Sequence, residues 1–232
     1  TIKDDLTDRQ WEFVIEASPM LIKYASQEIQ NKWAKGFLGV SYKTTGKLNG
    51  EFGLNMPGVY NVQNALIAST ICACENVDNE TMNAALAKVS VRGRTEVVRE
   101  VADITTVVID YAHNAISTMS LLSTLKAYEP KRLICIFGGG GNKAKQRRFD
   151  MGQAAGKYAD HIIITMDNPR FESMDAINAD IIKGIDSENG SYQIIDDRQE
   201  AIEYMLDNAK EDDIIALIGK GHEEYQEVNG EK

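Results

Sequence analysis

The chain has 232 residues, a formal net charge of −10 and a hydrophobic fraction of 43%. This composition is typical of a globular protein, and the length corresponds to one large domain or two small ones. The acidic balance disfavours a nucleic-acid surface or an anionic-membrane role, and no apolar run reaches the ~20 residues of a membrane span. The 3 cysteines form no Cys-x-x-Cys pair, so we expect neither a disulfide framework nor a zinc site.

The first region, residues 1 to about 92, has irregular hydrophobic periodicity. An Asn-Gly pair is typical of a tight turn between strands, and an aspartate before a helical pattern is typical of an N-cap. The predicted elements, in chain order, are a strand within 11–22, a polar helix over 26–35, a turn at Asn49-Gly50 between two strands, a helix opening near Asn61, and a helix over 78–88 capped by Asp78.

The second region, from about residue 93, alternates short apolar runs with helical stretches. The predicted strands are 106–109, 133–137, 162–165, 193–195 and 214–218, and the predicted helices are 117–128, 151–158, 175–185 and 198–210. Repeated strand-then-helix units are typical of a parallel sheet covered on both faces. The predicted fold class is therefore α/β, with a Rossmann-like, mostly parallel sheet.

Polar and charged residues follow each predicted strand of this sheet. They occupy 110–113, 138–143, 167–170, 196–198 and 219–223. In open α/β sheets, ligands bind outside the carboxyl ends of the strands. Five such loops at one edge indicate a charged ligand with several functional groups.

The glycine run Gly138–Gly141 precedes four cations, Lys143, Lys145, Arg147 and Arg148. Its backbone N–H groups and these cations could cradle an anion, or the run could be a flexible loop beside a solvated basic patch. The sequence contains no Gly-x-x-x-x-Gly-Lys-Ser/Thr motif, so we expect any ATP phosphate cradle to lie outside the chain.

Other strand ends carry more specific chemistry. Asp110 suits a ribose hydroxyl or a catalytic role, or it caps the following helix, and His113 is either a general base or a surface histidine. Pro169 fixes a turn from which Arg170 can offer a bidentate fork to a carboxylate, unless this is an ordinary turn with an exposed arginine. Glu223 could bind an ammonium group. Together these side chains suit an amino acid.

Six segments resemble, in order and spacing, the Mur ligase family of peptidoglycan precursor synthesis. They are residues 58–65, 93–96, 110–113, 137–141, 167–170 and 219–226. The resemblance implies that residues 1–92 are the C-terminal part of a central ATP-binding domain. Residues 93–232 would then be the C-terminal, amino-acid-binding domain without its last helix. The P-loop and the family's carbamylated lysine would lie upstream. The chain, which does not begin with Met, is therefore expected to be a piece truncated at both ends.

The resemblance also implies an activity. The complete protein would be an ATP-dependent amide ligase that adds an amino acid to UDP-N-acetylmuramoyl-L-alanyl-D-glutamate through an acyl phosphate. meso-Diaminopimelate is the favoured amino acid and L-lysine stays open. ATP and Mg²⁺ are the expected cofactors, and the chain itself is expected to contribute no metal ligand and to be inactive alone. We expect a cytoplasmic monomer with no nucleic-acid partner and no membrane insertion.

The family pattern also implies site residues. For ATP, Asn64 would contact the adenine, Arg94 the phosphates and Asp110 the ribose. The amino acid would be bound by Lys143, Asn168, Arg170, Gly219 and Glu223, with Arg170 clamping the distal carboxylate that lysine lacks. No catalytic residue is assigned within the chain.

Two departures from the family pattern keep alternatives open. After Asn114, Ala115-Ile116 stands where the family usually has a proline and an acid, and Lys143-Ala144 replaces a usual Arg-Asp pair. A lysine keeps the charge but loses the fork geometry. The alternatives are a folylpolyglutamate synthase-like or D-alanyl-D-alanine-adding ligase, or a non-catalytic amino-acid or nucleotide sensor. A P-loop upstream would indicate an enzyme, and its absence a sensor.

Overall fold

The computed structural model describes residues 29–34, 37–45, 48–98, 101 and 104–232. The chain divides into two compact units, and the main boundary along the sequence lies between Ser90 and Val91. The strand predicted within residues 11–22 lies outside the described residues. No helix in the described part of the chain is long and apolar enough to cross a membrane.

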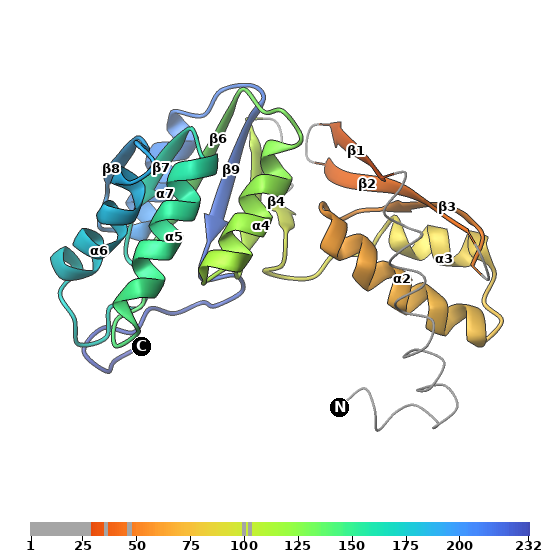
Figure 1. Cartoon of the computed structure of the whole chain (residues 1–232), viewed down its shortest axis with the longest axis horizontal. Helices are drawn as coiled ribbons and strands as arrows, with labels where there is room; N and C mark the ends of the chain where they lie inside the picture. The colour runs from red at the N-terminus through yellow and green to blue at the C-terminus, as the bar shows by residue number, and fades with distance from the viewer. Residues whose placement is uncertain (1–28, 35–36, 46–47, 99–100, 102–103) are drawn as a thin grey trace. The chain divides into compact units, whose positions relative to one another are not determined.

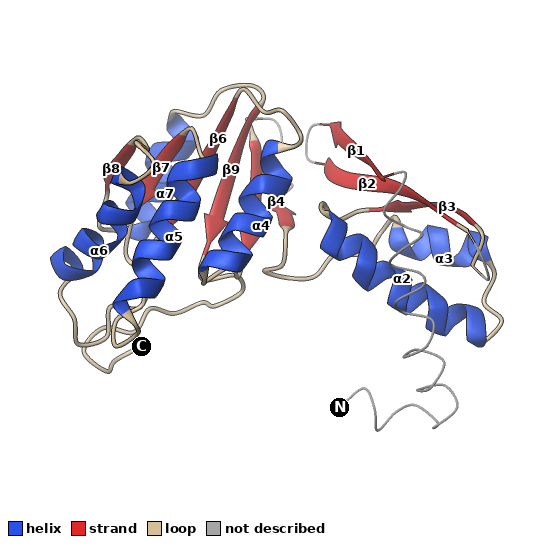
Figure 2. Ribbon diagram, in the orientation of Figure 1, coloured by secondary structure: helices blue, strands red, loops and turns tan. Residues whose placement is uncertain are grey.

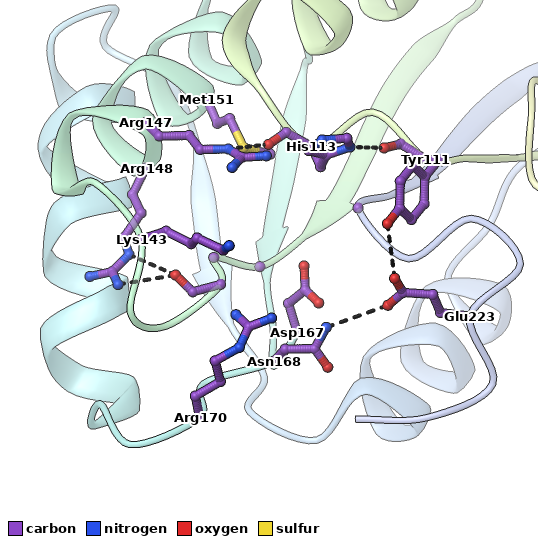
Figure 3. Close-up of a pocket in the computed structure, with 14 residues that line it drawn as sticks. Tyr111, His113, Lys143, Arg147, Arg148, Met151, Asp167, Asn168, Arg170 and Glu223 are labelled. Atoms are coloured by element: carbon purple, nitrogen blue, oxygen red, sulfur yellow. Dashed lines mark hydrogen bonds between the residues drawn. The ribbon is translucent and has the colours of Figure 1, made fainter. Parts of the chain in front are cut away.

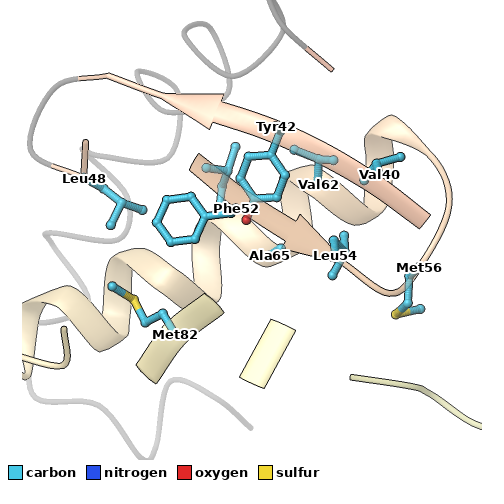
Figure 4. Close-up of a cluster of buried hydrophobic side chains, with 10 residues drawn as sticks. Val40, Tyr42, Leu48, Phe52, Leu54, Met56, Val62, Ala65 and Met82 are labelled. Carbon is cyan, nitrogen blue, oxygen red and sulfur yellow. The ribbon is translucent and has the colours of Figure 1, made fainter. Parts of the chain in front are cut away.

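The first unit combines a three-stranded sheet with two helices (Figure 1). The strands are β1 (Ile29–Ala34), β2 (Phe37–Thr44) and β3 (Gly50–Leu54), and the helices are α2 (Val59–Cys74) and α3 (Asn79–Leu86). Its apolar core lies between the sheet and the helices, with the Tyr42 and Phe52 rings stacked at a centroid distance of 5.6 Å (Figure 4). Burying these aromatic and aliphatic side chains is the main favourable contribution to folding.

Two of the three helices predicted for this unit are confirmed as α2 and α3. β2 and β3 form an antiparallel hairpin at the predicted place, but Gly50 is already the first residue of β3 and pairs with Thr44, so the connection is residues 45–49 and not a turn at Asn49-Gly50. Asp78 caps α3 by accepting a hydrogen bond of 2.7 Å from the Thr81 N–H. The polar helix predicted over residues 26–35 is wrong, because β1 occupies Ile29–Ala34. Pairing with β2 supplies the backbone hydrogen bonds there and outweighs local propensity.

The second unit contains a six-stranded sheet in the order β4-β5-β9-β6-β7-β8. Its strands are β4 (Glu96–Val98), β5 (Thr106–Asp110), β6 (Arg132–Phe137), β7 (His161–Ile164), β8 (Tyr192–Ile194) and β9 (Asp213–Ile218). β4 runs antiparallel to β5, and all other neighbours are parallel. The predicted mostly parallel α/β sheet is confirmed, and β4 is an additional edge strand.

Four helices cover the sheet. They are α4 (Ala115–Lys126), α5 (Lys145–Tyr158), α6 (Met174–Asp186) and α7 (Arg198–Asp207). Ala201 and Met205 of α7 pack on one face, against a cluster that includes Ile134 and Ile215, while α4 and α5 lie on the other face (Figure 2). α5 begins at Lys145 rather than at the predicted residue 151. This arrangement brings the carboxyl ends of β5, β9, β6 and β7 to one edge.

Candidate functional site

A cavity of about 230 Å³ lies at this edge of the sheet (Figure 3). The loops after β5, β6, β7 and β9 line it, and the lining includes the whole predicted amino-acid set, Lys143, Asn168, Arg170, Gly219 and Glu223. The loop after β8 lies at the same edge, where the Met166 N–H donates to the Asp196 carbonyl, but it contributes no residue to the lining of this cavity. In that loop, Asp197 caps α7 and Arg198 donates to the Ile218 carbonyl at 3.0 Å.

One side of the cavity is cationic. Arg170 is held by an ion pair of 3.0 Å from its Nε to Glu227 and by a 2.9 Å hydrogen bond from Nη1 to the Gly141 carbonyl. The guanidinium faces the cavity (Figure 3). A Cβ built on Gly140 would lie 3.4 Å from Arg170 Nη1 and 3.7 Å from Lys143 Cγ. The bare glycine thus leaves space for an anion between two cations.

The opposite side carries Glu223, whose two carboxylate oxygens are both held. Tyr111 donates its hydroxyl to Oε1 at 3.0 Å, and Lys220 donates to Oε2 at 3.1 Å. The Asn168 amide also reaches Oε2, at 3.4 Å. Burial raises the pKa of the Glu223 carboxyl, but the hydrogen bonds from Lys220 and Tyr111 outweigh it and keep the pKa below its ordinary value. Glu223 is therefore an oriented, ionised carboxylate that can bind an ammonium group.

Asp167 lies beside this group and is buried. Burial raises the pKa of its carboxyl, while the nearby cations Arg198 and Lys220 lower it by a smaller amount. The cavity therefore combines a cationic side, formed by Arg170 and Lys143, with an anionic side, formed by Glu223 and Asp167. This pattern complements a zwitterion.

Two of the loop glycines allow the β6 and β7 loops to approach each other. A Cβ on Gly138 would lie 2.0 Å from the Thr165 carbonyl oxygen, and one on Gly141 would lie 1.8 Å from the Pro169 carbonyl oxygen. The Gly141 N–H donates to the Asn168 carbonyl at 2.8 Å, so it is used within the protein. The Gly138 and Gly141 positions thus have a packing role, distinct from the predicted anion cradle or flexible loop.

Replacing Gly141 by alanine is expected to push the β7 loop away and lower the free energy of unfolding by about 1–3 kcal/mol, the usual range for overpacking. Gly140→Ala is the matched control, because its added Cβ meets only ordinary contacts. Urea denaturation of the two variants measures the difference. Equal stability of both would show that the loop yields to the extra methyl group without cost.

The residues predicted to bind ATP are distributed over both units. Asp110 accepts backbone hydrogen bonds of 2.7 Å from Thr95 and of 2.7 Å from Ala112, which tie the loop around Arg94 to the end of β5. Burial raises the pKa of the Asp110 carboxyl, and these hydrogen bonds lower it by a smaller amount. The Arg94 guanidinium lies 4.5 Å above the Tyr111 ring. Asn64 is exposed on α2 of the first unit.

The alternative role of Asp110 as a helix cap is wrong. Asn114 caps α4, with reciprocal hydrogen bonds to Ser117. Ala115, one of the residues that depart from the family pattern, is the first residue of this helix. His113 is exposed and lines the cavity, and its Nδ1 lies 2.8 Å from the Tyr111 carbonyl oxygen.

Arg148 was predicted only as one of four loop cations, and the structure gives it a different role. Its side chain is 2% exposed and forms ion pairs with Glu172 at 2.7 Å and Asp180 at 3.1 Å. It also donates to the Gly140 carbonyl at 3.0 Å, and so anchors the glycine loop to α5 and α6. Arg147 donates to the His113 carbonyl at 2.6 Å. The basic pattern in the sequence identified these residues as cations. It could not predict their acceptors, because most of these lie far away along the chain.

Comparison with known proteins identifies the family. Residues 93–221 match the family described as Mur ligase, glutamate ligase domain, and the chain therefore belongs to the Mur ligase family. Among its relatives is the UDP-N-acetylmuramoyl-L-alanyl-D-glutamate–2,6-diaminopimelate ligase of Caldanaerobacter subterraneus subsp. tengcongensis, 45% identical over 78% of this chain. The ligase of the same name from Aquifex aeolicus is 42% identical, again over 78% of the chain. In each case the chain covers 37% of the relative's length.

Solved structures give the same result. A structure of a UDP-N-acetylmuramoyl-L-alanyl-D-glutamate–2,6-diaminopimelate ligase is 32% identical, with a TM-score of 0.63, and the match covers 87% of this chain and 41% of that one. A folylpolyglutamate synthase of Thermotoga maritima, 20% identical with a TM-score of 0.60 over 82% of this chain and 43% of that one, shares the fold. The chain thus spans well under half the length of the relatives it matches.

Proposed function

We propose that the chain is the amino-acid-binding part of an ATP-dependent ligase that joins meso-diaminopimelate to UDP-N-acetylmuramoyl-L-alanyl-D-glutamate. The observation that carries the proposal is the cavity in which Arg170 and Lys143 face Glu223 and Asn168. The names of the relatives with 42–45% identity support the same activity.

The proposed amino acid follows from charge complementarity. Diaminopimelate carries two carboxylates and two amino groups, whereas lysine has only one carboxylate. Arg170 is fixed by Glu227 and the Gly141 carbonyl, so little side-chain entropy is lost when its guanidinium binds a distal carboxylate. Lys143 adds a second positive charge at the same side. A lysine substrate would leave both cations without a carboxylate partner, which favours diaminopimelate.

In the proposed reaction, ATP activates the terminal carboxylate of the nucleotide substrate as an acyl phosphate, and the amino group of diaminopimelate then displaces phosphate. The chain's contribution is to hold the incoming amino acid in one orientation, with Arg170 at one end and Glu223 at the other. Arg94 and Asp110 are the proposed contacts to the phosphates and the ribose, with Asn64 at the adenine. The remaining acceptor capacity of the Asp110 carboxylate fits ribose hydroxyls.

Within the described residues, no group of three or more His, Cys, Asp or Glu side chains is placed to hold a metal ion. We therefore assign the proposed Mg²⁺ to none of the described residues. We also propose that the complete protein acts in the cytoplasm and is a monomer.

The test is phosphate release by the full-length protein with ATP, Mg²⁺ and UDP-N-acetylmuramoyl-L-alanyl-D-glutamate. Addition of meso-diaminopimelate is expected to start turnover, and L-lysine is expected to be poorly used. Turnover that depends on lysine would agree with the ligase proposal, but it would exclude Arg170 as the residue that binds a distal carboxylate. No release with either amino acid would remove this substrate assignment and favour a different ligase or a sensor.

A further inference from the structure

Lys220 is a buried cation that lies behind the wall of the cavity. Its side chain is 8% exposed, and it is not among the residues that line the cavity. It follows β9 directly and makes three polar contacts, to Asn168 Oδ1 at 2.9 Å, to Glu223 Oε2 at 3.1 Å and to Asp167 Oδ1 at 3.6 Å. The partners of Lys220 are thus polar groups of the cavity wall.

The contact with Asn168 fixes which way its amide points. Asn168 Oδ1 accepts hydrogen bonds from Lys220 and from the Glu227 N–H, which lies at 2.9 Å. Two donors at one side of the amide require an oxygen there. The Nδ2 group must therefore face Glu223 and the cavity. Removing the Lys220 ammonium would leave the Glu227 N–H as the donor to Oδ1, and so would weaken the preference for this orientation.

The contact of Lys220 with Glu223 places a positive charge beside a carboxylate. Asp167 and Glu223 are two carboxylates that both contact the Lys220 ammonium, and like charges in a buried site disfavour ionisation of both. The other groups around Glu223 are the Tyr111 hydroxyl and the Asn168 amide, while Arg198 is a second cation near Asp167. Lys220 therefore offsets negative charge at both carboxylates, and Arg198 adds to this at Asp167.

We propose that Lys220 is a positioning residue for the amino acid: from behind the cavity it orients the Asn168 amide and holds the Glu223 carboxylate in place. This inference rests on the proposed function, and it adds a residue that does not touch the substrate. It implies that affinity for the amino acid depends on the Lys220 charge, whereas affinity for ATP does not.

The first test is Lys220→Met in the full-length protein, with KM and kcat measured for both substrates. We expect the KM for diaminopimelate to rise about ten- to hundredfold, the cost of a lost hydrogen-bond network at a charged group, while the KM for ATP stays within about twofold. Lys126→Met is the matched control. It also removes a lysine bonded to a carboxylate, Asp160, but in a surface pair away from the cavity, and is expected to leave both constants unchanged.

The second readout separates positioning from a merely structural role. Without the cation, the pKa of Glu223 rises, so the acid limb of the kcat/KM profile for diaminopimelate is expected to move to higher pH. Lys220→Arg, which retains the charge, is expected to restore the wild-type limb. If Lys220→Met does not fold, Lys220→Gln supplies the uncharged comparison, since it keeps one donor.

An uncharged, folded variant with unchanged diaminopimelate KM and an unmoved acid limb would overturn the proposal. So would an equal rise in the KM for both substrates, because that indicates general loosening of the fold. If the wild-type protein shows no diaminopimelate-dependent phosphate release, the proposed function fails instead. The two failures are therefore distinguishable.

Discussion

Arg170→Ala is expected to raise the KM for diaminopimelate about ten- to hundredfold in the full-length protein and to leave the KM for ATP nearly unchanged. The substitution removes a charge-assisted contact to the distal carboxylate, which is worth roughly 1.5–3 kcal/mol. It also removes the cation beside Gly140, where the cavity has room for an anion. Steady-state kinetics with each substrate varied in turn measures the effect.

Glu227→Gln is the matched control for this substitution. Arg170→Ala also breaks the ion pair with Glu227, and Glu227→Gln breaks the same pair while retaining the guanidinium. We expect the control to raise the KM for diaminopimelate only a few-fold. If both variants lose affinity equally, the loop conformation rather than the guanidinium determines binding, and Arg170 is not the clamp.

Arg148→Met is expected to cause the largest loss of stability, about 3–5 kcal/mol, which is typical of removing one partner from a buried ion pair. The 2% exposed guanidinium holds Glu172, Asp180 and the Gly140 carbonyl, and a methionine would leave all three without this donor. The two carboxylates would then face each other across an apolar side chain.

Urea denaturation followed by far-UV circular dichroism measures this loss. Tryptophan fluorescence would not report on the second unit, because the 2 tryptophans, Trp11 and Trp33, both precede it. Lys126→Met again serves as the control. Its pair with Asp160 is about 40% exposed on both sides, and surface pairs contribute only ~0–1 kcal/mol. A loss for Arg148→Met no larger than for this control would show that the buried network does not stabilise the fold.

Much of the second unit could be predicted from the sequence, since its strands are continuous apolar runs. The predicted runs at 106–109 and 133–137 became β5 and β6 almost residue for residue. Strands buried on both faces need such runs, and helices need a different period. β1 and β4 could not be predicted this way, because their stability depends on a neighbouring strand rather than on their own pattern.

The beginning of α5 was predicted too late for a related reason. Its first turns carry Lys145, Gln146, Arg147 and Arg148, which show no apolar periodicity. Arg148 is buried nonetheless, because Glu172 and Asp180 on other segments neutralise it. A sequence pattern shows the type of a side chain but not its partner, so this charged residue was not predicted to be buried.

The candidate site, too, could be predicted from the sequence only in part. The residues at the strand ends could be predicted because parallel strands bring their carboxyl ends together, and the predicted amino-acid set does line one cavity. The links behind them could not be predicted. Tyr111 reaches Glu223 across 112 positions of sequence, and Lys220 reaches Asn168 across 52. Only the packed fold brings these side chains within hydrogen-bonding distance.

The place of β9 has a consequence for synthesis of the protein. β9 is the last strand of the sheet in sequence, yet it pairs with both β5 and β6 in the centre. A nascent chain that ends before Asp213 lacks the strand that joins the two halves of the sheet. The second unit must therefore complete its fold after residue 218 has left the ribosome, and until then the apolar edges of β5 and β6 stay exposed to chaperones and proteases.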